Sequence, residues 1–327
     1  MAISLGTPSS PFTYAATLVG DDAGGTLVIG NPQAGRGRVV RRWDEVLGRL
    51  RDAGLDPQGR LTEHPGHATE LARKARSEGR ELVVAVGGDG TVHEVVNGLL
   101  ADGEPTSPDE VLPALGLVPA GSGCDYARTF AVPSGVAAAV AHLVSAGVRS
   151  VDVGKLRCQG DAGEHDRHFV NVAEVGIGAE VADRASRLPR NLGAGRYALA
   201  FTLTLAGQRT VTAEAEIDGD RYQGPLTNLV VALGQYYGGG MRVAPRADPS
   251  DGRFEVQVQF GTKADYALAM PKVFRGTHLP HPRVREERAE TVVVRCDPAA
   301  RVEADGEVLG TTPAHFSILP GALRVRA

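Results

Sequence analysis

The chain has 327 residues, of which 42% are hydrophobic and 23% charged, and its formal net charge is -4. This length exceeds the usual size of one hydrophobic core and predicts two domains, while the apolar fraction excludes a disordered or fibrous protein. The weakly acidic balance provides no basic footprint for nucleic acid, so an anionic ligand must be held by a local site.

Cysteine usage and hydropathy indicate a cytoplasmic protein. The three cysteines, Cys124, Cys158 and Cys296, lack the paired spacing of a zinc site or a disulfide framework. Residues 1–24 have neither the basic start nor the apolar run of a signal peptide, and we expect a flexible tail. The most apolar later stretch, Tyr197–Leu205, is far shorter than the ~20 residues that span a bilayer. The protein would therefore reach lipid only from the membrane surface.

Residues 25–150 alternate short apolar runs with helical periodicity, which predicts a parallel sheet covered by helices. Strands are expected at Leu27–Ile29, Leu82–Val86 and Leu115–Val118, and each is followed by a glycine-containing loop and a helix. Ser134 is expected to cap a helix that runs to Gly147.

The pattern changes after Val151. Residues 210–217 and 254–260 alternate apolar and polar side chains with period two, which predicts a mainly antiparallel β-sandwich. Two helical stretches, at residues 196–205 and 264–274, interrupt it.

The loops at residues 31–37, 87–91 and 119–125 indicate phosphate binding. Backbone amides at a helix N-terminus point outward, and glycine lets a phosphate approach them closely. A plain tight turn would explain any one loop equally well, but three together favour a phosphate ligand. Asp89 would repel a polyphosphate unless a cation bridges the two or its carboxylate bonds to another substrate group. Because the spacings GxGxxG and GxxxxGK[ST] are missing, we expect a different nucleotide site.

The second loop, Gly87-Gly88-Asp89-Gly90-Thr91, together with Glu94 and Asn97, resembles the nucleotide signature of diacylglycerol kinase catalytic domains, which sphingosine, ceramide and NAD kinases share. Other segments follow the order of that family, namely Asn31–Gly35, Thr62–Ala68, Pro119–Arg128, Val151–Gly154, Asn171–Gly178, Tyr237–Gly240, Ala244–Pro245, Ser250–Gly252 and Asp305–Glu307.

The resemblance implies a three-layer α/β nucleotide-binding domain over residues 25–150 and a mainly antiparallel β-sandwich substrate domain over residues 151–312. ATP is expected in the cleft between them, and residues 313–327 are expected to return to the first domain.

The same resemblance implies an ATP- and Mg²⁺-dependent kinase that phosphorylates a hydroxyl of a lipid or lipid-like alcohol, of diacylglycerol or sphingoid type. Glu307 is the implied base, but the sphingosine-kinase branch gives this role to Asp89, and both assignments stay open. Asp89 is otherwise part of the magnesium and nucleotide network. The implied nucleotide contacts are Asn31, Pro32, Gln33, Ala34, Gly35, Thr62, Gly87, Gly88, Asp89, Gly90, Thr91, Glu94, Gly121, Ser122 and Asp125.

Further sites are implied in the second half. Asp248, Asp251 and the backbone of Arg253 match a structural metal site of the family, although an ordinary Asp-Gly turn explains them equally well. The substrate contacts implied are Glu180, at the position of an acidic contact to the lipid head, and Tyr197 and Phe201, whose spacing suits an apolar wall or an ordinary core helix.

Two departures from the family pattern, Cys124 for Asn and His67 for Asp, imply altered ATP contacts. An NAD kinase-like enzyme and a non-catalytic lipid-binding regulator with the same fold remain alternatives. The expected partners are a lipid-like alcohol and, transiently, a membrane surface, and a homodimer is left open. The membrane contact is expected at a basic cluster formed by Lys272, Arg275, Arg283, Arg285 and Arg288.

Overall fold

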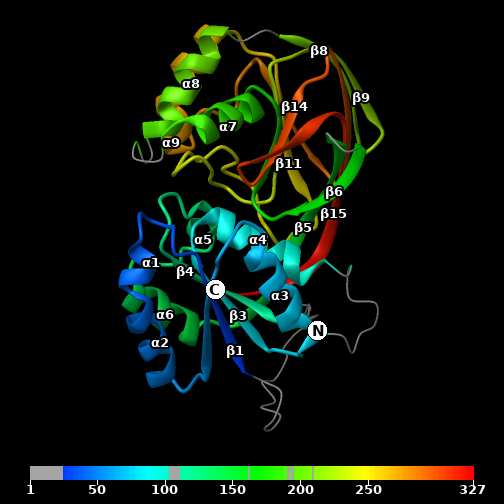
Figure 1. Cartoon of the computed structure of the whole chain (residues 1–327). Coiled ribbons are helices and arrows are strands. Elements are labelled where there is room, and N and C mark those ends of the chain that lie inside the picture. The colour runs from blue at the N-terminus through cyan, green and yellow to red at the C-terminus, as the bar shows by residue number, and fades with distance from the viewer. Residues whose placement is uncertain are drawn as a thin grey trace, which may run out of the picture.

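A computed structural model of the chain describes residues 25–101, 103, 111–160, 163–189, 192, 195–207 and 210–327. The tail expected at residues 1–24 lies outside the described residues. The chain folds into two halves, one above the other in Figure 1. No helix in the described part is long and apolar enough to cross a membrane.

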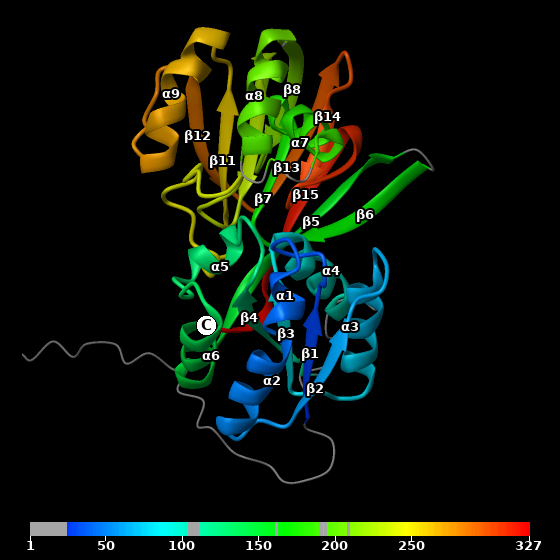
Figure 2. The same cartoon turned by 60° about the vertical axis from the view of Figure 1, so that its left-hand side comes forward.

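The first half is a parallel sheet with helices on both faces. Its strand order is β2 (Pro57–Leu61), β1 (Thr26–Gly30), β3 (Leu82–Gly87) and β4 (Ala114–Pro119). One face is covered by α1 (Arg38–Arg41), α2 (Trp43–Asp52) and α6 (Val136–Ser145), and the other by α3 (His67–Ser77) and α4 (Asp89–Leu99) (Figure 2). Strands covered on both faces must be apolar throughout, which explains the continuous apolar runs of β1 and β3.

The second half is built from antiparallel strands around a separate hydrophobic core. Its strands are β6 (Gly163–Phe169), β7 (Val172–Gly176), β8 (Val211–Ile217), β9 (Asp220–Leu226), β10 (Asn228–Ala232), β11 (Phe254–Gln259), β12 (Val284–Ala289), β13 (Thr291–Asp297) and β14 (Arg301–Ala304). Three helices, α7 (Ile177–Arg187), α8 (Gly195–Gly207) and α9 (Lys263–Arg275), gather at one side of it (Figures 1 and 2). The predicted fold class, a parallel α/β part joined to antiparallel strands, is confirmed.

Two long strands, β5 (Val148–Gly160) and β15 (Glu307–Arg326), run through both halves and pair with each other antiparallel (Figure 1). Near its end, β15 also pairs in parallel with β4, with Val325 opposite Leu115. Both strands therefore contribute to both cores: Val151 and Leu323 lie in the first, and Leu156 and Phe316 in the second. The domain limits at residues 150 and 312 stay a prediction.

The start of α6 differs from the expectation. The N-cap is Gly135 with φ 96, and no side chain caps the helix, so the prediction that Ser134 caps it is wrong. A glycine adopts this positive φ without strain, and it turns the chain into the helix without a hydroxyl. Two helices, α3 and α7, were not expected, because the faces that they bury consist largely of alanine and give a weak periodic signal.

Two helical glycines allow a matched test of the packing between α3 and α4. A Cβ at Gly98 would lie 2.3 Å from the carbonyl oxygen of Thr69, whereas nothing lies within 4 Å of a Cβ at Gly48 in α2. We expect Gly98→Ala to lower the free energy of unfolding by roughly 1–3 kcal/mol, because the α3 backbone must move. Gly48→Ala should raise it by roughly 0.5–1 kcal/mol. Urea denaturation of both variants measures the difference, and equal effects would contradict the tight packing.

Candidate active site

A cavity of about 1820 Å³ lies between the two halves and is lined by both. The first half contributes the glycine loops. The second half contributes β7, β10, the turn between β14 and β15, and the helices α7 to α9. Most of the predicted nucleotide contacts line this cavity, namely Asn31, Gln33, Ala34, Gly35, Gly88, Asp89, Gly90, Thr91, Gly121, Ser122 and Asp125.

The three glycine loops pack directly against one another. A Cβ at Gly35, where φ is +57, would lie 2.1 Å from the carbonyl oxygen of Ala120, and a Cβ at Gly121 would lie 2.4 Å from the Cα of Gly88. Only glycine permits these approaches. The loops therefore form one continuous backbone surface beside the N-terminus of α4, which is suited to a phosphate group.

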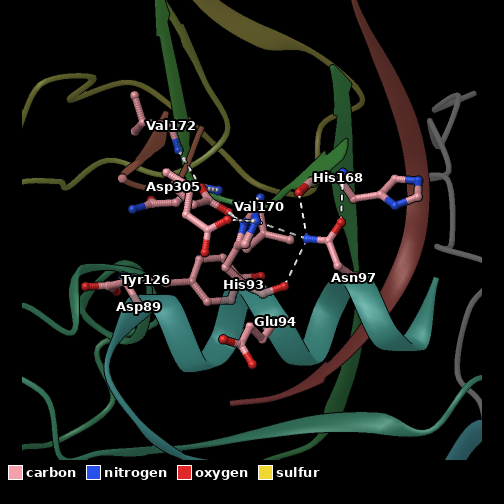
Figure 3. A network of polar contacts seen from close by, with 12 residues as sticks. Asp89, His93, Glu94, Asn97, Tyr126, His168, Val170, Val172 and Asp305 are labelled. Atoms are coloured by element: carbon pink, nitrogen blue, oxygen red, sulfur yellow. Dashed lines mark hydrogen bonds and ion pairs between the residues drawn. The ribbon is translucent and has the colours of Figure 1, made fainter. Parts of the chain in front are cut away.

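Four predicted nucleotide contacts, Pro32, Thr62, Gly87 and Glu94, do not line the cavity. Glu94 leaves α4 on the side away from Asp305 (Figure 3), and its Oε2 accepts a hydrogen bond from the amide of Ala68 at 3.1 Å. It thereby holds the start of α3 against α4. The amide of Thr62 donates to the carbonyl oxygen of Gly30 at 2.8 Å.

Three arginines in and directly after the first glycine loop also line the cavity, Arg36, Arg38 and Arg41. Arg38 Nε donates to the Gly35 carbonyl oxygen at 3.1 Å, and Arg41 Nη1 donates to the Arg36 carbonyl oxygen at 3.2 Å. These guanidinium groups bring positive charge to the phosphate surface of an otherwise acidic protein. The sequence motif predicted this loop as a phosphate site but did not indicate a role for these arginines.

Asp89 and Asp125 converge beside the loops. A Cβ at Gly123 would lie 2.9 Å from Asp89 Oδ2 and 3.4 Å from Asp125 Oδ2. Burial raises the pKa of Asp89, and burial together with the charge of Asp89 raises the pKa of Asp125 to about 6. A bound cation would relieve this repulsion, and carboxylate oxygens are the ligands that Mg²⁺ prefers.

Asp305 forms a hydrogen-bonded hub with residues of both halves (Figure 3). Its carboxylate accepts hydrogen bonds from the amides of Val170 and Asn171, both at 3.0 Å, and of Val172 at 3.2 Å. The same carboxylate lies 3.1 Å from His93 Nδ1. Asp305 has φ 51, so its turn is held in the left-handed region by these contacts.

His93 joins this hub to the predicted base, Glu307. Its Nε2 lies 3.4 Å from Glu307 Oε2. The two N–H groups of the Asn97 amide are already directed to the carbonyl oxygens of His93, at 2.9 Å, and His168, at 3.0 Å. The contact of 3.3 Å between Asn97 Nδ2 and His93 Nε2 therefore needs no hydrogen bond, and Nε2–H is directed to Glu307.

The ion pairs determine the charge states of His93 and Glu307. Burial by itself lowers the pKa of His93, but the hydrogen bonds and charges of Asp305 and Glu307 outweigh it and raise the pKa to about 9. The hydrogen bond from His93 lowers the pKa of Glu307 against the effect of burial. At neutral pH an imidazolium thus lies between two carboxylates. His93 was not predicted, although its place four residues after Asp89 puts both on one face of α4.

At the predicted structural metal site, the two aspartates form hydrogen-bonded turns with nearby backbone amides. Asp248 Oδ1 accepts a hydrogen bond from the amide of Ser250, and Asp251 Oδ1 accepts one from the amide of Arg253, both at 3.0 Å. Asp251 also pairs with Arg288. Among the described residues, no group of three or more His, Cys, Asp or Glu side chains is arranged to hold a metal ion. The metal assignment stays a prediction.

The predicted substrate contacts lie in different places. Phe201 in α8 lines the cavity, whereas Glu180 is exposed on α7 and does not line it. The side chain of Tyr197 lies outside the described residues. The carboxylates that do line the cavity from the second half include Glu174 and Glu303, which the sequence analysis did not single out.

The two departures from the loop pattern have local roles. Burial raises the pKa of the Cys124 thiol to about 11, so the thiol stays neutral. His67 is the first residue of α3, and its Nδ1 accepts a hydrogen bond from the amide of Glu63 at 3.0 Å. Neither residue lines the large cavity.

Comparisons with known proteins agree with this geometry. Residues 25–156 match the model of the diacylglycerol kinase catalytic domain, and residues 171–327 match the model described as "YegS C-terminal NAD kinase beta sandwich-like domain". A diacylglycerol kinase of Mycobacterium tuberculosis is 31% identical over 314 residues, which cover 95% of this chain and 97% of the relative. The chain belongs to the diacylglycerol kinase family.

Other members of the diacylglycerol kinase family show the same extent of similarity. The diacylglycerol kinase of Bacillus subtilis is 30% identical over 292 residues, which cover 88% of this chain and 91% of the relative. Two crystal structures of Bacillus anthracis strain Sterne proteins match 92% of this chain and 96% of their own chains. The first has a TM-score of 0.74 and a sequence identity of 26%. The second, described as a diacylglycerol kinase, has a TM-score of 0.68 and a sequence identity of 23%.

The charge state of His93 can be tested through stability. Its pKa is higher in the folded than in the unfolded protein, so its ion pairs stabilise the fold at low pH and lose this contribution as the pH rises towards 9. Between about pH 7 and pH 9.5, the stability difference between wild type and His93→Gln should fall by about 2 kcal/mol.

His168→Gln is the matched control. Burial lowers the pKa of His168 to about 4, so this ring is neutral across the whole range. Its stability difference should stay constant, and a constant difference for His93→Gln as well would show that His93 is not an imidazolium. Urea titrations at each pH supply both values.

Proposed function

We propose that the protein transfers a phosphoryl group from ATP, in the presence of Mg²⁺, to a hydroxyl group of a lipid-like alcohol. The observation that carries the proposal is the composition of one cavity, which combines the glycine loops, the ionised carboxylate of Glu307 and an apolar wall. Relatives named diacylglycerol kinases that match nearly the whole chain support the same reaction class.

The nucleotide end of the proposal rests on the loops and their charges. The polyphosphate would lie on the backbone surface formed around Gly88 and Gly121, with Arg36, Arg38 and Arg41 beside it. Asp89 and Asp125 would hold Mg²⁺, which neutralises charge on the transferred group. Two carboxylates suffice because Mg²⁺ is usually bound by one or two of them together with phosphate oxygens and water.

The chemical step assigned to this chain is removal of the hydroxyl proton. The acceptor oxygen forms a bond to the γ-phosphorus, the bond from this phosphorus to the bridging oxygen of ADP breaks, and Glu307 takes the hydroxyl proton. His93 orients Glu307, and Asp305 fixes the ring of His93. Asp89 is the alternative base, but its Oδ1 already accepts a hydrogen bond from the amide of Tyr126 at 3.0 Å.

The acceptor end is supported by the size and lining of the cavity. Ligand sites usually measure roughly 300–1,000 Å³, so the volume of about 1820 Å³ leaves room for an alkyl chain beside a nucleotide. Apolar side chains from three helices line it, including Val181, Phe201, Leu205 and Met270. These features favour a lipid-like acceptor over a small polar one.

Substitution of the proposed base should separate chemistry from binding. We expect Glu307→Gln to lower the single-turnover rate by roughly 10²–10⁴-fold, because glutamine keeps the shape and cannot take a proton. ATP affinity should stay close to that of wild type, since Glu307 acts on the acceptor. Asp89→Asn should reduce turnover through the magnesium network and weaken ATP binding. Asp305→Asn should affect chemistry less and stability more, through its hydrogen bonds to three amides.

Rapid quench with radiolabelled ATP and a lipid extract gives the rates, and equilibrium titration gives the nucleotide affinity. Near-normal chemistry in Glu307→Gln would transfer the base role to Asp89. Failure of the wild type to phosphorylate any lipid would favour the non-catalytic regulator with the same fold.

We also propose that α8 and α9 contact the membrane surface. Their cavity-lining residues lie beside exposed apolar ones: Leu268 is 74% exposed and Phe274 53%. Lys272 and Arg275 in the last turn of α9 add positive charge for anionic lipid. Three members of the expected basic cluster are paired with acids, Arg283 with Asp265, Arg285 with Glu287 and Arg288 with Asp251, so they contribute less charge.

Sedimentation with vesicles of phosphatidylglycerol and phosphatidylcholine measures this contact. Leu268→Gln should reduce the bound fraction several-fold, because loss of buried apolar area costs about 25 cal/mol per Å². Val148→Gln is the control, since Val148 is 45% exposed on β5 in the other half. Equal binding of both variants, or binding that is indifferent to salt, would contradict the proposal.

A further inference from the structure

Two buried glutamates form a pair in the wall of the cavity. Glu174 in β7 and Glu303 in β14 are direct partners across the two strands. They are only 1% and 2% exposed, yet both line the cavity. The two carboxyl groups interact directly, which favours a proton shared between them.

Neutral groups form the hydrogen bonds that the described residues donate to this pair. Asn228 Nδ2 donates to Glu174 Oε1 at 2.7 Å, the hydroxyl of Tyr237 is hydrogen-bonded to Glu174, and the amide of Gly306 donates to Glu303 Oε2 at 2.8 Å. Among these partners in the described part of the chain there is no Lys, Arg or His. Burial raises the pKa of Glu174 to about 7 and that of Glu303 well above its ordinary value.

The local structure orients the pair and leaves it no room to turn away. Asn228 Oδ1 accepts the amide of Gly178 at 3.0 Å, which directs the Asn228 N–H groups to Glu174. A Cβ at Gly178 would lie 2.1 Å from Glu174 Oε2, so a larger residue would displace the carboxyl. A buried negative charge without a cation is costly, and a site arranged in this way gains most from a cationic ligand group.

We propose that the Glu174–Glu303 pair binds the protonated amino group of the acceptor, which is therefore a long-chain amino alcohol and not a neutral diacylglycerol. This inference rests on the proposed kinase function. An ammonium group carries three N–H donors and one positive charge, which match two adjacent carboxyl groups that share one proton.

The position of the pair relative to the proposed base supports an amine close to the reacting hydroxyl. Glu303 accepts its hydrogen bond from Gly306, and the next residue is Glu307. The amine and the hydroxyl of the acceptor would thus be held by two neighbouring parts of one turn. The alkyl chain would extend along the apolar wall formed by α7, α8 and α9.

Two acceptors that differ only at nitrogen test the inference, a C18 2-amino-1,3-diol and its N-acetyl derivative. A dioleoylglycerol serves as the neutral acceptor without nitrogen, and all three are used in the same detergent micelles. We expect the kcat/KM of the wild type to be at least about tenfold higher for the amine than for the N-acetyl compound, as for a charge pair removed from water. Glu174→Gln should remove most of this preference. Glu214→Gln, at an exposed carboxylate on β8 that does not line the cavity, should keep it and is the matched control.

A second measurement does not depend on turnover, and its main comparison uses the wild type alone. The amine should raise the Tm of the wild type more than the N-acetyl compound does, and Glu303→Gln should reduce this difference. Equal or better use of dioleoylglycerol, or a preference unchanged in both glutamate variants, would overturn the inference and leave the kinase function standing. Amine-dependent stabilisation without phosphorylation of any acceptor would support the amine site and overturn the kinase function instead.

Discussion

The contacts of the Asp305 carboxylate hold the candidate site together. One side chain accepts hydrogen bonds from three consecutive amides at the junction of β6 and β7, and it pairs with His93 on α4. It is 3% exposed, so these bonds are shielded from water and each contributes more than it would at a surface. The turn that carries Glu307, the helix that carries Asp89 and the strand that carries Glu174 are fixed relative to one another through this group.

The glycine loops of the first half form the other side of the candidate site. Because Gly35 and Gly121 allow backbone to touch backbone, the loops after β1, β3 and β4 meet in one surface, and the first residues of α4 line the cavity beside it. Carboxylates from the same loops then lie beside a phosphate surface that also carries arginine side chains. Groups that attract a polyphosphate thus lie next to two carboxylates that repel each other, and the proposed Mg²⁺ would bind between the phosphate and these carboxylates.

The sequence predicted those parts of the site that lie in local motifs. The strand, loop and helix of residues 82–99 have continuous apolar periodicity and a glycine turn, and the structure has them as expected. The ring of His93 and the carboxylate of Asp305 are 212 residues apart in the chain, so only the fold reveals their contact. Glu174 was not predicted, because a polar residue inside a strand usually faces solvent, whereas β7 is buried on both faces.

Some predictions failed or stayed open for equally physical reasons. Ser134 has the usual chemistry of a cap, but Gly135 supplies the required φ and the helix starts without a side-chain bond. Asp248 and Asp251 accept hydrogen bonds from nearby backbone amides, as in ordinary Asx turns. In a sequence, an aspartate that binds a metal cannot be told from one that forms such a turn. The apolar wall was expected on α8 only, but α7 and α9 contribute to it as well.

The paired strands β5 and β15 have a mechanical consequence. Each passes through both hydrophobic cores, and β15 is also joined to β4. A hinge motion that separates the two halves would have to bend this continuous two-stranded ribbon and break some of its hydrogen bonds. A flexible linker would allow such a motion without this energetic cost. We therefore expect the halves to keep a nearly constant separation during turnover. The proposed lipid acceptor would then enter by displacement of α8 and α9, while the glycine loops and the proposed base keep their relative positions.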